Sequence, residues 1–302
     1  MLNEFGPAVV ATKLGITRQS VHRRRRRIEL RMEKPIHVRE HPNKLQQQAD
    51  IPGRLILEVD NGIVLIGSDS HYWPGVVSTA HRAFVHFCRA LNPKAIIKNG
   101  DELDGASISR FPPIGWEKRP TLADEIQAVK ERLDEITVAA PKALRYWPLG
   151  NHDARFETRL ATVAPEFAKI HGIHLKDHFV DWEPCWSVWI NDEVVVKHRY
   201  KGGIWATRNN TLLAGKTILT GHLHSLKVTP HSDYNGTRYG VDCGSLAEPF
   251  GPQFAGYMED NPRDWRSGFV VLTFRDGRLL PPEIVHVWEE GKVTFRGEII
   301  NV

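Results

Sequence analysis

The chain has 302 residues, of which 41% are apolar and 25% are charged, a composition typical of soluble globular proteins. Its longest apolar runs, Ile63 to Gly67 and Val194 to Val196, are far shorter than the ~18–20 residues that a membrane-spanning helix needs. The three cysteines are scattered and lack metal-knuckle spacing, and no apolar signal segment follows the start. We therefore expect a cytoplasmic protein with no membrane partner.

Positive charge is concentrated in the N-terminal part of the chain. Residues 1–41 hold ten Lys and Arg side chains and four acidic ones, a net charge of +6, which leaves −2 for the rest of the chain. An asymmetry of this kind indicates a basic arm for polyanions attached to a nearly neutral body. The expected partner of the arm is nucleic acid.

Residues 1–34 contain the signals of two short helices joined by a glycine turn. Pro7 can open the first helix, Gly15 can end it, and Thr17 can cap a second helix from Arg18 to Leu30. This order resembles a helix-turn-helix, whose second helix enters the major groove of DNA. The resemblance implies nucleic-acid contacts from Arg18, Arg23, Arg24, Arg25, Arg26 and Arg27. A solvated basic helix without a binding role is the alternative.

The rest of the chain divides into a linker at 35–53, which has no hydrophobic period, and one large domain at 54–302. Strand patterns in the domain alternate with helical patterns at 75–91 and 121–138, which predicts an α/β fold. Later strand patterns with few helices predict a second sheet packed on the first. Strands are expected at 54–60, 63–68, 94–99, 144–149, 185–190, 193–198, 216–220, 226–232, 237–243, 268–274 and 283–288.

Polar residues of metal-ligand type follow five of the predicted strands. Loops at strand ends are where a rigid sheet holds side chains convergently, so the sequence predicts one site drawn from distant parts of the chain. In chain order the motifs are D-x-H at Asp69 and His71, G-D-x-x-D at Asp101 and Asp104, G-N-H-D at Asn151, His152 and Asp153, the single His198, and G-H-x-H at His222 and His224.

The ordered set of five motifs, along residues 63–224, resembles the calcineurin-like metallophosphoesterase superfamily. The resemblance implies an α/β fold of the metallophosphoesterase type, a four-layer β-sandwich flanked by helices, with two metal ions at the strand ends. It also implies the ligands: Asp69, His71 and His224 for the first metal, Asn151, His198 and His222 for the second, and Asp101 bridging both.

Two divalent ions are the cofactors that this ligand set favours. Two neighbouring cations repel, so a shared carboxylate and a shared hydroxide must screen them. Imidazoles combined with oxygen ligands suit Mn²⁺, which we expect, or Fe²⁺, Zn²⁺, Co²⁺ or Ni²⁺. Mg²⁺ and Ca²⁺ prefer oxygen alone. Glycines before Asp101, Asn151 and His222 are expected to permit tight turns that aim these side chains inward.

The expected reaction is phosphoester hydrolysis. A hydroxide between the metals attacks phosphorus in line while the metals take charge from the phosphoryl oxygens. By resemblance, His152 contacts the phosphate and protonates the leaving oxygen, and Asp104 orients His152. Asp153 is a candidate for structural support of that loop.

The substrate class is narrowed by departures from the protein phosphatases of the superfamily. Those enzymes have an arginine directly after G-D-x-x-D and a G-N-H-E motif, where this chain has Gly105 and Asp153. Because a basic arm gains affinity for a phosphate backbone by releasing counterions, a nuclease is the favoured hypothesis. The alternatives are a small-molecule phosphatase or (cyclic) nucleotide phosphodiesterase and, in a different class, a DNA-binding scaffold.

Overall fold

The structure, a computed structural model, describes residues 10, 13–16, 18–32, 51–261 and 263–302. The chain divides into two compact units, residues 1–50 and 51–302. In the first unit, the helix predicted from Arg18 is present as α2, Arg18–Met32, and Gly15 before it adopts a left-handed φ of 59°. Val10 and Val21 are buried against each other. Most of the predicted linker at 35–53 lies outside the described residues.

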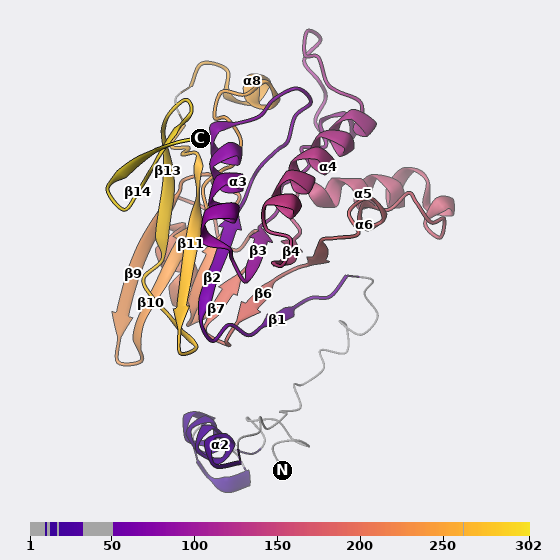
Figure 1. Ribbon diagram of the computed structural model, residues 1–302. Coiled ribbons are helices and arrows are strands. Elements are labelled where there is room, and N and C mark those ends of the chain that lie inside the picture. Colours follow the sequence, from indigo (N-terminus) through magenta and orange to yellow (C-terminus); the bar gives the residue numbers. More distant parts are fainter. Residues whose placement is uncertain (1–9, 11–12, 17, 33–50, 262) are drawn as a thin grey trace. The chain divides into compact units, whose positions relative to one another are not determined.

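The larger unit contains two β-sheets (Figure 1). The nine-stranded sheet has the order β15–β14–β13–β11–β2–β3–β4–β5, and β12 pairs with β11. Its strands β2, β3, β4 and β5 run parallel to one another, whereas β11 to β15 pair in antiparallel fashion. The bounds are β2 Gly62–Gly67, β3 Ala95–Lys98, β4 Leu144–Pro148, β5 Glu183–Cys185, β11 Gly268–Arg275, β12 Arg278–Leu279, β13 Glu283–Glu289, β14 Lys292–Phe295 and β15 Glu298–Asn301.

The six-stranded sheet has the order β1–β6–β7–β8–β10–β9. Strands β7 and β8 are parallel, as are β8 and β10, so the carboxyl ends of β7 and β8 lie at one edge. The bounds are β1 Leu55–Leu57, β6 Val188–Ile190, β7 Val194–Val196, β8 Thr217–Thr220, β9 Lys227–Asp233 and β10 Gly236–Asp242.

Helices cover the outer faces of both sheets. Helices α3 and α4 lie along the nine-stranded sheet (Figure 1), and α7 packs on β8, β9 and β10 of the other sheet. Side-chain caps explain where the two long helices begin: Ser78 accepts a hydrogen bond from the His81 amide, and Thr121 forms a capping box with Asp124. The bounds are α3 Thr79–Leu91, α4 Leu122–Ala139, α5 Asp153–Val163, α6 Leu175–His178, α7 Ala206–Ala214 and α8 Ala255–Met258, with short 3₁₀ turns η2 Ala106–Ile108, η3 Pro165–Phe167 and η4 Pro252–Phe254.

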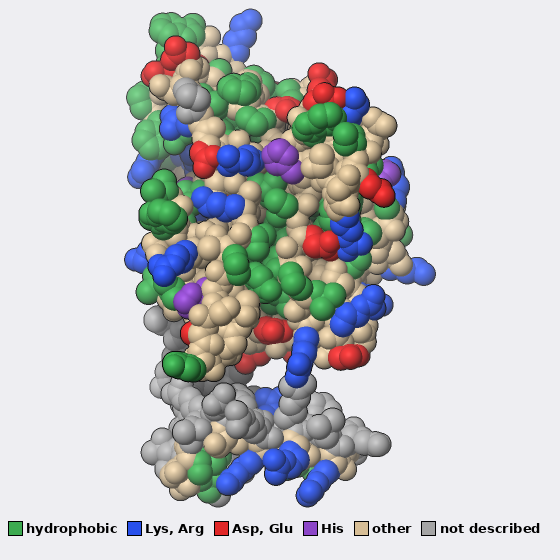
Figure 2. Space-filling model, turned by 90° about the vertical axis from the view of Figure 1, so that its left-hand side faces the viewer, with side chains coloured by type: hydrophobic (Ala, Val, Ile, Leu, Met, Phe, Trp, Pro, Cys, Tyr) green, Lys and Arg blue, Asp and Glu red, His purple; other side chains and the backbone are tan. Residues whose placement is uncertain are grey.

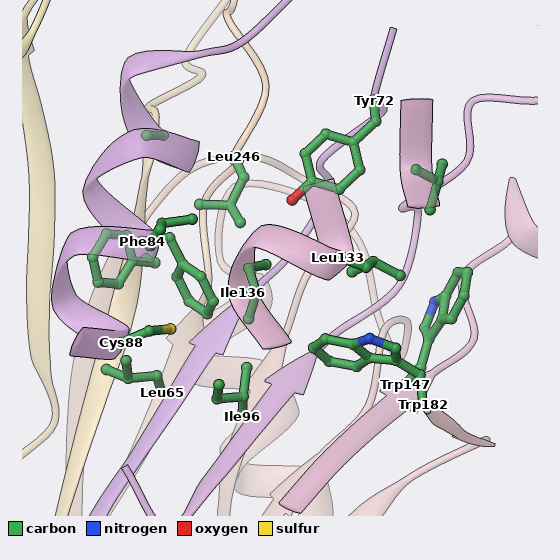
Figure 3. Packing of buried hydrophobic residues seen from close by; sticks show 14 of the residues in the cluster. Leu65, Tyr72, Phe84, Cys88, Ile96, Leu133, Ile136, Trp147, Trp182 and Leu246 are labelled. Carbon is green, nitrogen blue, oxygen red and sulfur yellow. The ribbon is translucent and has the colours of Figure 1, made fainter. Parts of the chain in front are cut away.

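Two hydrophobic cores lie on opposite faces of the nine-stranded sheet. Leu65 of β2 packs toward α3 and α4, together with the residues shown in Figure 3. Its neighbours Val64 and Ile66 point the other way, into the core shared with the six-stranded sheet. Successive residues of a strand face opposite sides, so a strand buried on both faces has an unbroken apolar run. The layers are therefore helix, sheet, sheet and helix, which confirms the predicted fold class.

The strand predicted at 185–190 is wrong in one respect, because the segment forms two strands in two different sheets. Cys185 of β5 pairs with Pro148 in the nine-stranded sheet, whereas Val188 of β6 pairs with Leu55 in the six-stranded sheet. Trp186, 46% exposed, lies where the chain passes from one sheet to the other. The apolar pattern continues through this crossing, since both halves are buried, so periodicity alone did not reveal it.

One face of the larger unit has mixed charge. Figure 2 shows one face on which basic and acidic side chains are interspersed and hydrophobic side chains gather between them. Among the described residues, no helix is long and apolar enough to cross a membrane. Cys88, Cys185 and Cys243 are buried and free, as expected from their spacing.

Candidate metal centre

The carboxyl ends of strands from both sheets supply the five motifs. Strands β2, β3 and β4 are neighbours in parallel register, so the loops that follow them meet at one end of the nine-stranded sheet (Figure 1). The loops after β7 and β8 contribute from the other sheet. The predicted site residues Asp69, His71, Asp101, Asp104, Asn151, His152, His198, His222 and His224 all follow these five strands.

The first predicted ligand group is assembled in the structure. Possible ligand atoms of Asp69, His71 and His224 lie within 4.8 Å of one another, and all three side chains are buried. His224 Nε2 is 3.1 Å from Asp69 Oδ1. Both carboxylate oxygens of Asp69 also accept the backbone amide of His222, at 3.0 and 2.9 Å. The D-x-H and G-H-x-H motifs therefore contact each other directly.

Two of the three ligands predicted for the second metal, His198 and His222, lie beside Asp101, whereas the position of Asn151 as a ligand stays a prediction. Possible ligand atoms of Asp101, His198 and His222 lie within 4.8 Å of one another. His198 Nε2 is 3.1 Å from Asp101 Oδ2, and the other ring nitrogen, Nδ1, donates to the Asn99 carbonyl oxygen at 2.7 Å. That bond fixes the ring so that Nε2 faces the site. The bridging role predicted for Asp101 is compatible with its position, since His71 also lies in a group with Asp101.

Buried polar atoms without hydrogen-bond partners test whether this centre suits metal ions. His71 Nε2 and Asn151 Oδ1 are buried and make no hydrogen bond within the described part of the chain. An unpaired buried polar atom is costly, so such atoms demand an explanation. Both belong to the predicted ligand set, and imidazole nitrogens with amide and carboxylate oxygens suit borderline divalent cations. The residues present therefore fit two metal ions.

The charges of the centre favour a bound cation. Burial would raise the pKa of Asp69, but the imidazoles of His224 and His198 outweigh it and bring the pKa to about 2. Burial would likewise raise the pKa of Asp101, yet His198 and His152 hold it well below its usual range. Burial would lower the pKa of His198, but Asp101 and Asp69 raise it to about 10. The two carboxylates thus attract positive charge, which a divalent cation supplies as well as an imidazolium does.

His152 lies beside the ligands with its ring held on both sides. Its Nδ1 donates to the Asp104 carbonyl oxygen at 2.8 Å and is 3.3 Å from Asp104 Oδ1. Arg155 Nη2 donates to His152 Nε2 at 3.1 Å, and Arg155 Nη1 donates to the Asp104 carbonyl oxygen at 2.9 Å. A guanidinium can only donate, so this contact forms only while Nε2 is unprotonated and the ring carries its proton on Nδ1. Burial would lower the pKa of His152, but Asp101 and Asp104 raise it above its usual value.

Asp104 contacts two histidines rather than one. Its Oδ1 accepts a hydrogen bond from His71 Nδ1 at 2.9 Å, in addition to facing His152. The Asp104 carboxylate therefore orients both His71, a predicted metal ligand, and His152, the predicted proton donor. Sequence reasoning assigned it to His152 alone.

Asp153 supports the loops around the site. Its carboxylate accepts the backbone amides of Gly150, Asp101, Glu102 and Leu103 at 2.8 to 3.2 Å. Trp147 Nε1 donates to the same carboxylate at 3.0 Å. One buried side chain thus ties the G-N-H-D turn to the G-D-x-x-D turn, which is the structural role expected for it.

Other charged residues near the centre were missed by sequence reasoning. Lys98 and Glu102 form a fully buried ion pair, with Lys98 Nζ 3.0 Å from Glu102 Oε2. Lys98 also donates to Ser70 Oγ at 2.7 Å, inside the D-x-H motif. Arg155 was missed as well. Their positions in the sequence could have indicated that they lie near the centre. Lys98 is the last residue of a strand, Glu102 lies inside the G-D-x-x-D motif, and Arg155 is about one helical turn after His152.

The N-terminal arginines belong to the other compact unit. Arg24 and Arg27 are exposed on α2, and Arg25 is partly buried. The side chains of Arg18, Arg23 and Arg26 lie outside the described part of the structure. The binding role predicted for these residues, like the helix-turn-helix interpretation, stays a prediction.

No family model and no curated protein sequence matches the chain. Among solved structures, the chain is similar to Vps29 from Entamoeba histolytica, complexed with zinc, with 15% identity over 79% of this chain and 98% of that one and a TM-score of 0.42. It is similar to the phosphoesterase YfcE from E. coli, with 14% identity over 79% and 96% and a TM-score of 0.34. It is similar to a protein serine/threonine phosphatase from Saccharomyces cerevisiae, with 12% identity over 83% and 88% and a TM-score of 0.38. The resemblance to calcineurin-like metallophosphoesterases rests on the order of the five motifs and their convergence in space.

Proposed function

We propose that this protein is a binuclear metal-dependent phosphoesterase that hydrolyses phosphodiester bonds, with nucleic acid as its substrate. The observation that supports the activity is the convergence of five motifs on three overlapping groups of possible ligand atoms, which share His71 and Asp101. Two atoms of the proposed ligand set, His71 Nε2 and Asn151 Oδ1, are buried without a hydrogen-bond partner, which is the arrangement expected of metal ligands.

In this proposal, Asp69, His71 and His224 hold one cation and Asn151, His198 and His222 hold the other. Asp101 is shared. When bound, the two ions would supply an acidified water and neutralise charge on the phosphoryl group. Mn²⁺ is the proposed ion, because imidazole and carboxylate ligands together suit it better than they suit Mg²⁺.

The chain's own residues then bind the phosphoryl group and move protons. His152 Nε2 lies 4.0 Å from Asp101 Oδ2, so the ring is next to the shared carboxylate. In the proposal, a phosphoryl group bound at the two ions lies within reach of this ring. To protonate a leaving oxygen, Nε2 must first gain a proton, and Arg155 must release this atom, since two donors cannot share one hydrogen bond. An arriving phosphate attracts the guanidinium, which would free Nε2.

Nucleic acid is the proposed substrate because of the N-terminal arm. Its net charge of +6 contrasts with −2 for the remaining chain. A basic segment tethered to a hydrolase raises the local concentration of the site near a phosphate backbone. The mixed charge seen in Figure 2 favours a second candidate, hydrolysis of small phosphoesters, because this face of the body has no dominant positive charge among its described residues.

Replacing the shared carboxylate tests the activity. We expect Asp101→Ala to lose bound metal and hydrolysis of bis(4-nitrophenyl) phosphate together, because one side chain serves both ions. The control is Asp134→Ala, which changes an exposed carboxylate on α4. Metal content and turnover are measured for both variants with Mn²⁺. An Asp101→Ala protein with two tightly bound ions and normal turnover contradicts the assignment, and an inactive wild-type protein leaves the DNA-binding scaffold as the better hypothesis.

A further inference from the structure

The segment that follows the last motif places aromatic rings against two of the proposed ligands. Phe254 of η4 packs on the ring of His71, with centroids 5.1 Å apart, and its centroid is 5.7 Å from that of His224. Trp265 lies 4.5 Å from His224 and 5.0 Å from Phe254. Phe254 and Trp265, which precede and follow α8 in the chain, therefore border the proposed first metal, at the end of the sheet where Figure 1 shows α8.

The series of rings leads from the ligands to the surface. Phe254 is only 5% exposed, whereas Tyr257 is 66% exposed. The Tyr257 ring lies nearly parallel to Trp265, at 10° and a centroid distance of 6.0 Å. Arg263 Cζ is 4.9 Å from the Tyr257 centroid, and Arg263 Nη2 donates to the Tyr257 carbonyl oxygen at 3.1 Å. The outermost member is thus a largely exposed ring with the exposed guanidinium of Arg263 over part of it.

A second loop holds this segment in place. A Cβ on Gly256 would lie 1.8 Å from Glu117 Oε1, so the backbone of α8 lies directly against the Glu117 side chain. Arg119 Nη2 donates to Glu117 Oε2 at 2.9 Å, and the Ile114 amide donates to the same oxygen at 3.1 Å. Glu117, held by these bonds within its own loop, therefore packs against the backbone of α8 next to Tyr257.

Packing accounts for Phe254 but not for Tyr257. Phe254 belongs to a small buried cluster with Ala247 and Met258. Tyr257 leaves most of its ring in water, so it adds little to that cluster. An exposed aromatic ring beside an arginine is the arrangement on which nucleobases stack, since every base has a flat π-face and its phosphate is anionic.

We propose that Tyr257, supported by Trp265 and flanked by Arg263, is a binding subsite for the base of a nucleoside whose phosphoester lies at the metal centre. This inference rests on the proposed function and names the substrate class of that site as nucleoside phosphodiesters. Two ring contacts connect the proposed ligand His224 to Tyr257: His224 to Trp265 at 4.5 Å and Trp265 to Tyr257 at 6.0 Å. Stacking tolerates different bases, so the subsite gives preference for nucleosides without selecting a base sequence.

Two substrates with the same leaving group test the subsite. Thymidine 5′-(4-nitrophenyl phosphate) and methyl 4-nitrophenyl phosphate both release nitrophenolate and differ in carrying a nucleoside or a methyl group. For Tyr257→Ala we expect kcat/KM to fall about 5–100-fold on the thymidine ester, the factor that corresponds to loss of one base stack. The methyl ester is expected to keep its wild-type kcat/KM. Tyr257→Phe retains the ring and is expected to behave as wild type on both esters.

Phe250→Ala is the matched control. Phe250 is an aromatic residue of the neighbouring loop, 85% exposed, and makes no ring contact with any described residue. We expect this variant to hydrolyse both esters like the wild type. If Tyr257→Ala changes both esters equally, or changes neither, the subsite is overturned.

A binding measurement keeps the subsite testable if the protein proves inactive. Calorimetric titration of wild type with thymidine 5′-monophosphate and with ribose 5-phosphate, which lacks a base, is expected to show tighter binding of the nucleotide. Tyr257→Ala is expected to remove the difference. Inactivity on both esters would overturn the proposed function, whereas equal affinity of the wild type for both phosphates would overturn the subsite.

Discussion

Backbone conformation at single residues explains how the motifs turn their side chains toward one point. Asp69, His71, Asp101, His222 and His224 all have left-handed φ values, from 39° to 73°. Such a conformation costs a non-glycine residue about 1–2 kcal/mol, and it persists only where surrounding contacts enforce it. Here the enforcing contacts are hydrogen bonds between motifs, such as the amide of His71 donating to the Asp101 carbonyl oxygen at 2.9 Å. The strain lies where the predicted ligands are.

Glycines of the motifs act in two different ways. Gly100, before Asp101, has a left-handed φ of 84°, which agrees with the expected tight turn. Gly150 has no such φ; its role is close approach, since a Cβ there would lie 2.0 Å from Asp101 Oδ1. Gly221 is similar, because a Cβ there would lie 2.1 Å from Ser68 Oγ. Of the three glycines, one is therefore needed for its backbone conformation, and two are needed because another motif lies too close for a side chain.

Gly150→Ala tests this reason for the glycine. The added methyl must displace Asp101 or the G-N-H-D turn, so we expect a loss of stability of about 1–3 kcal/mol together with weaker metal binding. Gly202→Ala is the control, because Gly202 is exposed and a Cβ there meets nothing within 4 Å. Chemical unfolding and metal titration measure the two effects. Equal stability and equal metal affinity of the two variants would show that the turn accommodates the methyl group.

His152→Ala tests the proton donor. We expect turnover to fall ~10²–10⁴-fold with an alkoxide leaving group, the usual range for general acid–base catalysis, while metal content stays normal. Asp104→Asn is expected to reduce turnover less, in the same direction. Nitrophenolate needs little protonation, so a nitrophenyl ester is expected to be affected much less by His152→Ala. Equal losses on both esters would leave phosphate binding as the role of His152.

A buried histidine outside the predicted ligand set, His81, connects two helices through hydrogen bonds. His81 of α3 is buried, accepts a hydrogen bond from Tyr72 Oη at 2.9 Å and donates through Nε2 to Glu135 Oε2 of α4 at 2.7 Å. Lys98 of β3 donates to Tyr72 Oη at 3.3 Å. Burial lowers the pKa of His81 despite the hydrogen bond to Glu135, and the charges of Lys98 and Arg132 act in the same direction as burial. The neutral imidazole therefore joins the two helices.

The stability of the larger unit is expected to depend on pH through this histidine. The unfolded chain takes up a proton near the ordinary pKa of 6.5, before the folded protein does. The contribution of His81 is thus present above that pH and is lost as the pH falls below it. We expect His81→Gln to show a smaller decrease in unfolding free energy between mildly alkaline and mildly acidic urea titrations. An unchanged pH dependence in the variant would mean that other groups cause the decrease.

The charge distribution along the chain separates a basic arm from the unit that holds the candidate metal centre. The described centre lies entirely within the unit of residues 51–302, whereas the excess positive charge lies in the unit of residues 1–50. No residue of the arm is among the assembled ligand groups of the described chain. The arm and the centre are therefore expected to make separable contributions.

Deleting residues 1–34, which carry a net charge of +6, tests this separation. Hydrolysis of a small phosphodiester is expected to continue nearly unchanged, while hydrolysis of long DNA or RNA at moderate salt weakens. The salt dependence is expected to flatten, because each lost phosphate contact reduces the log–log slope by ~0.7–0.9. Rates are measured on both substrates across a salt titration. Equal rates on long nucleic acid with and without the arm would place small phosphoesters ahead of nucleic acid as the substrate.

Local sequence by itself determined much of this protein: apolar runs located most of the strands, although not β14 and β15, helical patterns located α3 and α4, and five motifs at strand ends located the candidate centre. These features are local, because hydrophobic periodicity and motif spacing involve residues near in sequence. Only the tertiary structure decided that residues 183–190 serve two sheets, that Asp104 faces two histidines, and that Arg155 holds His152. It alone placed Phe254 and Trp265 beside the ligands. Such contacts join segments far apart in sequence, and their partners are selected by how the two sheets pack, which no local pattern records.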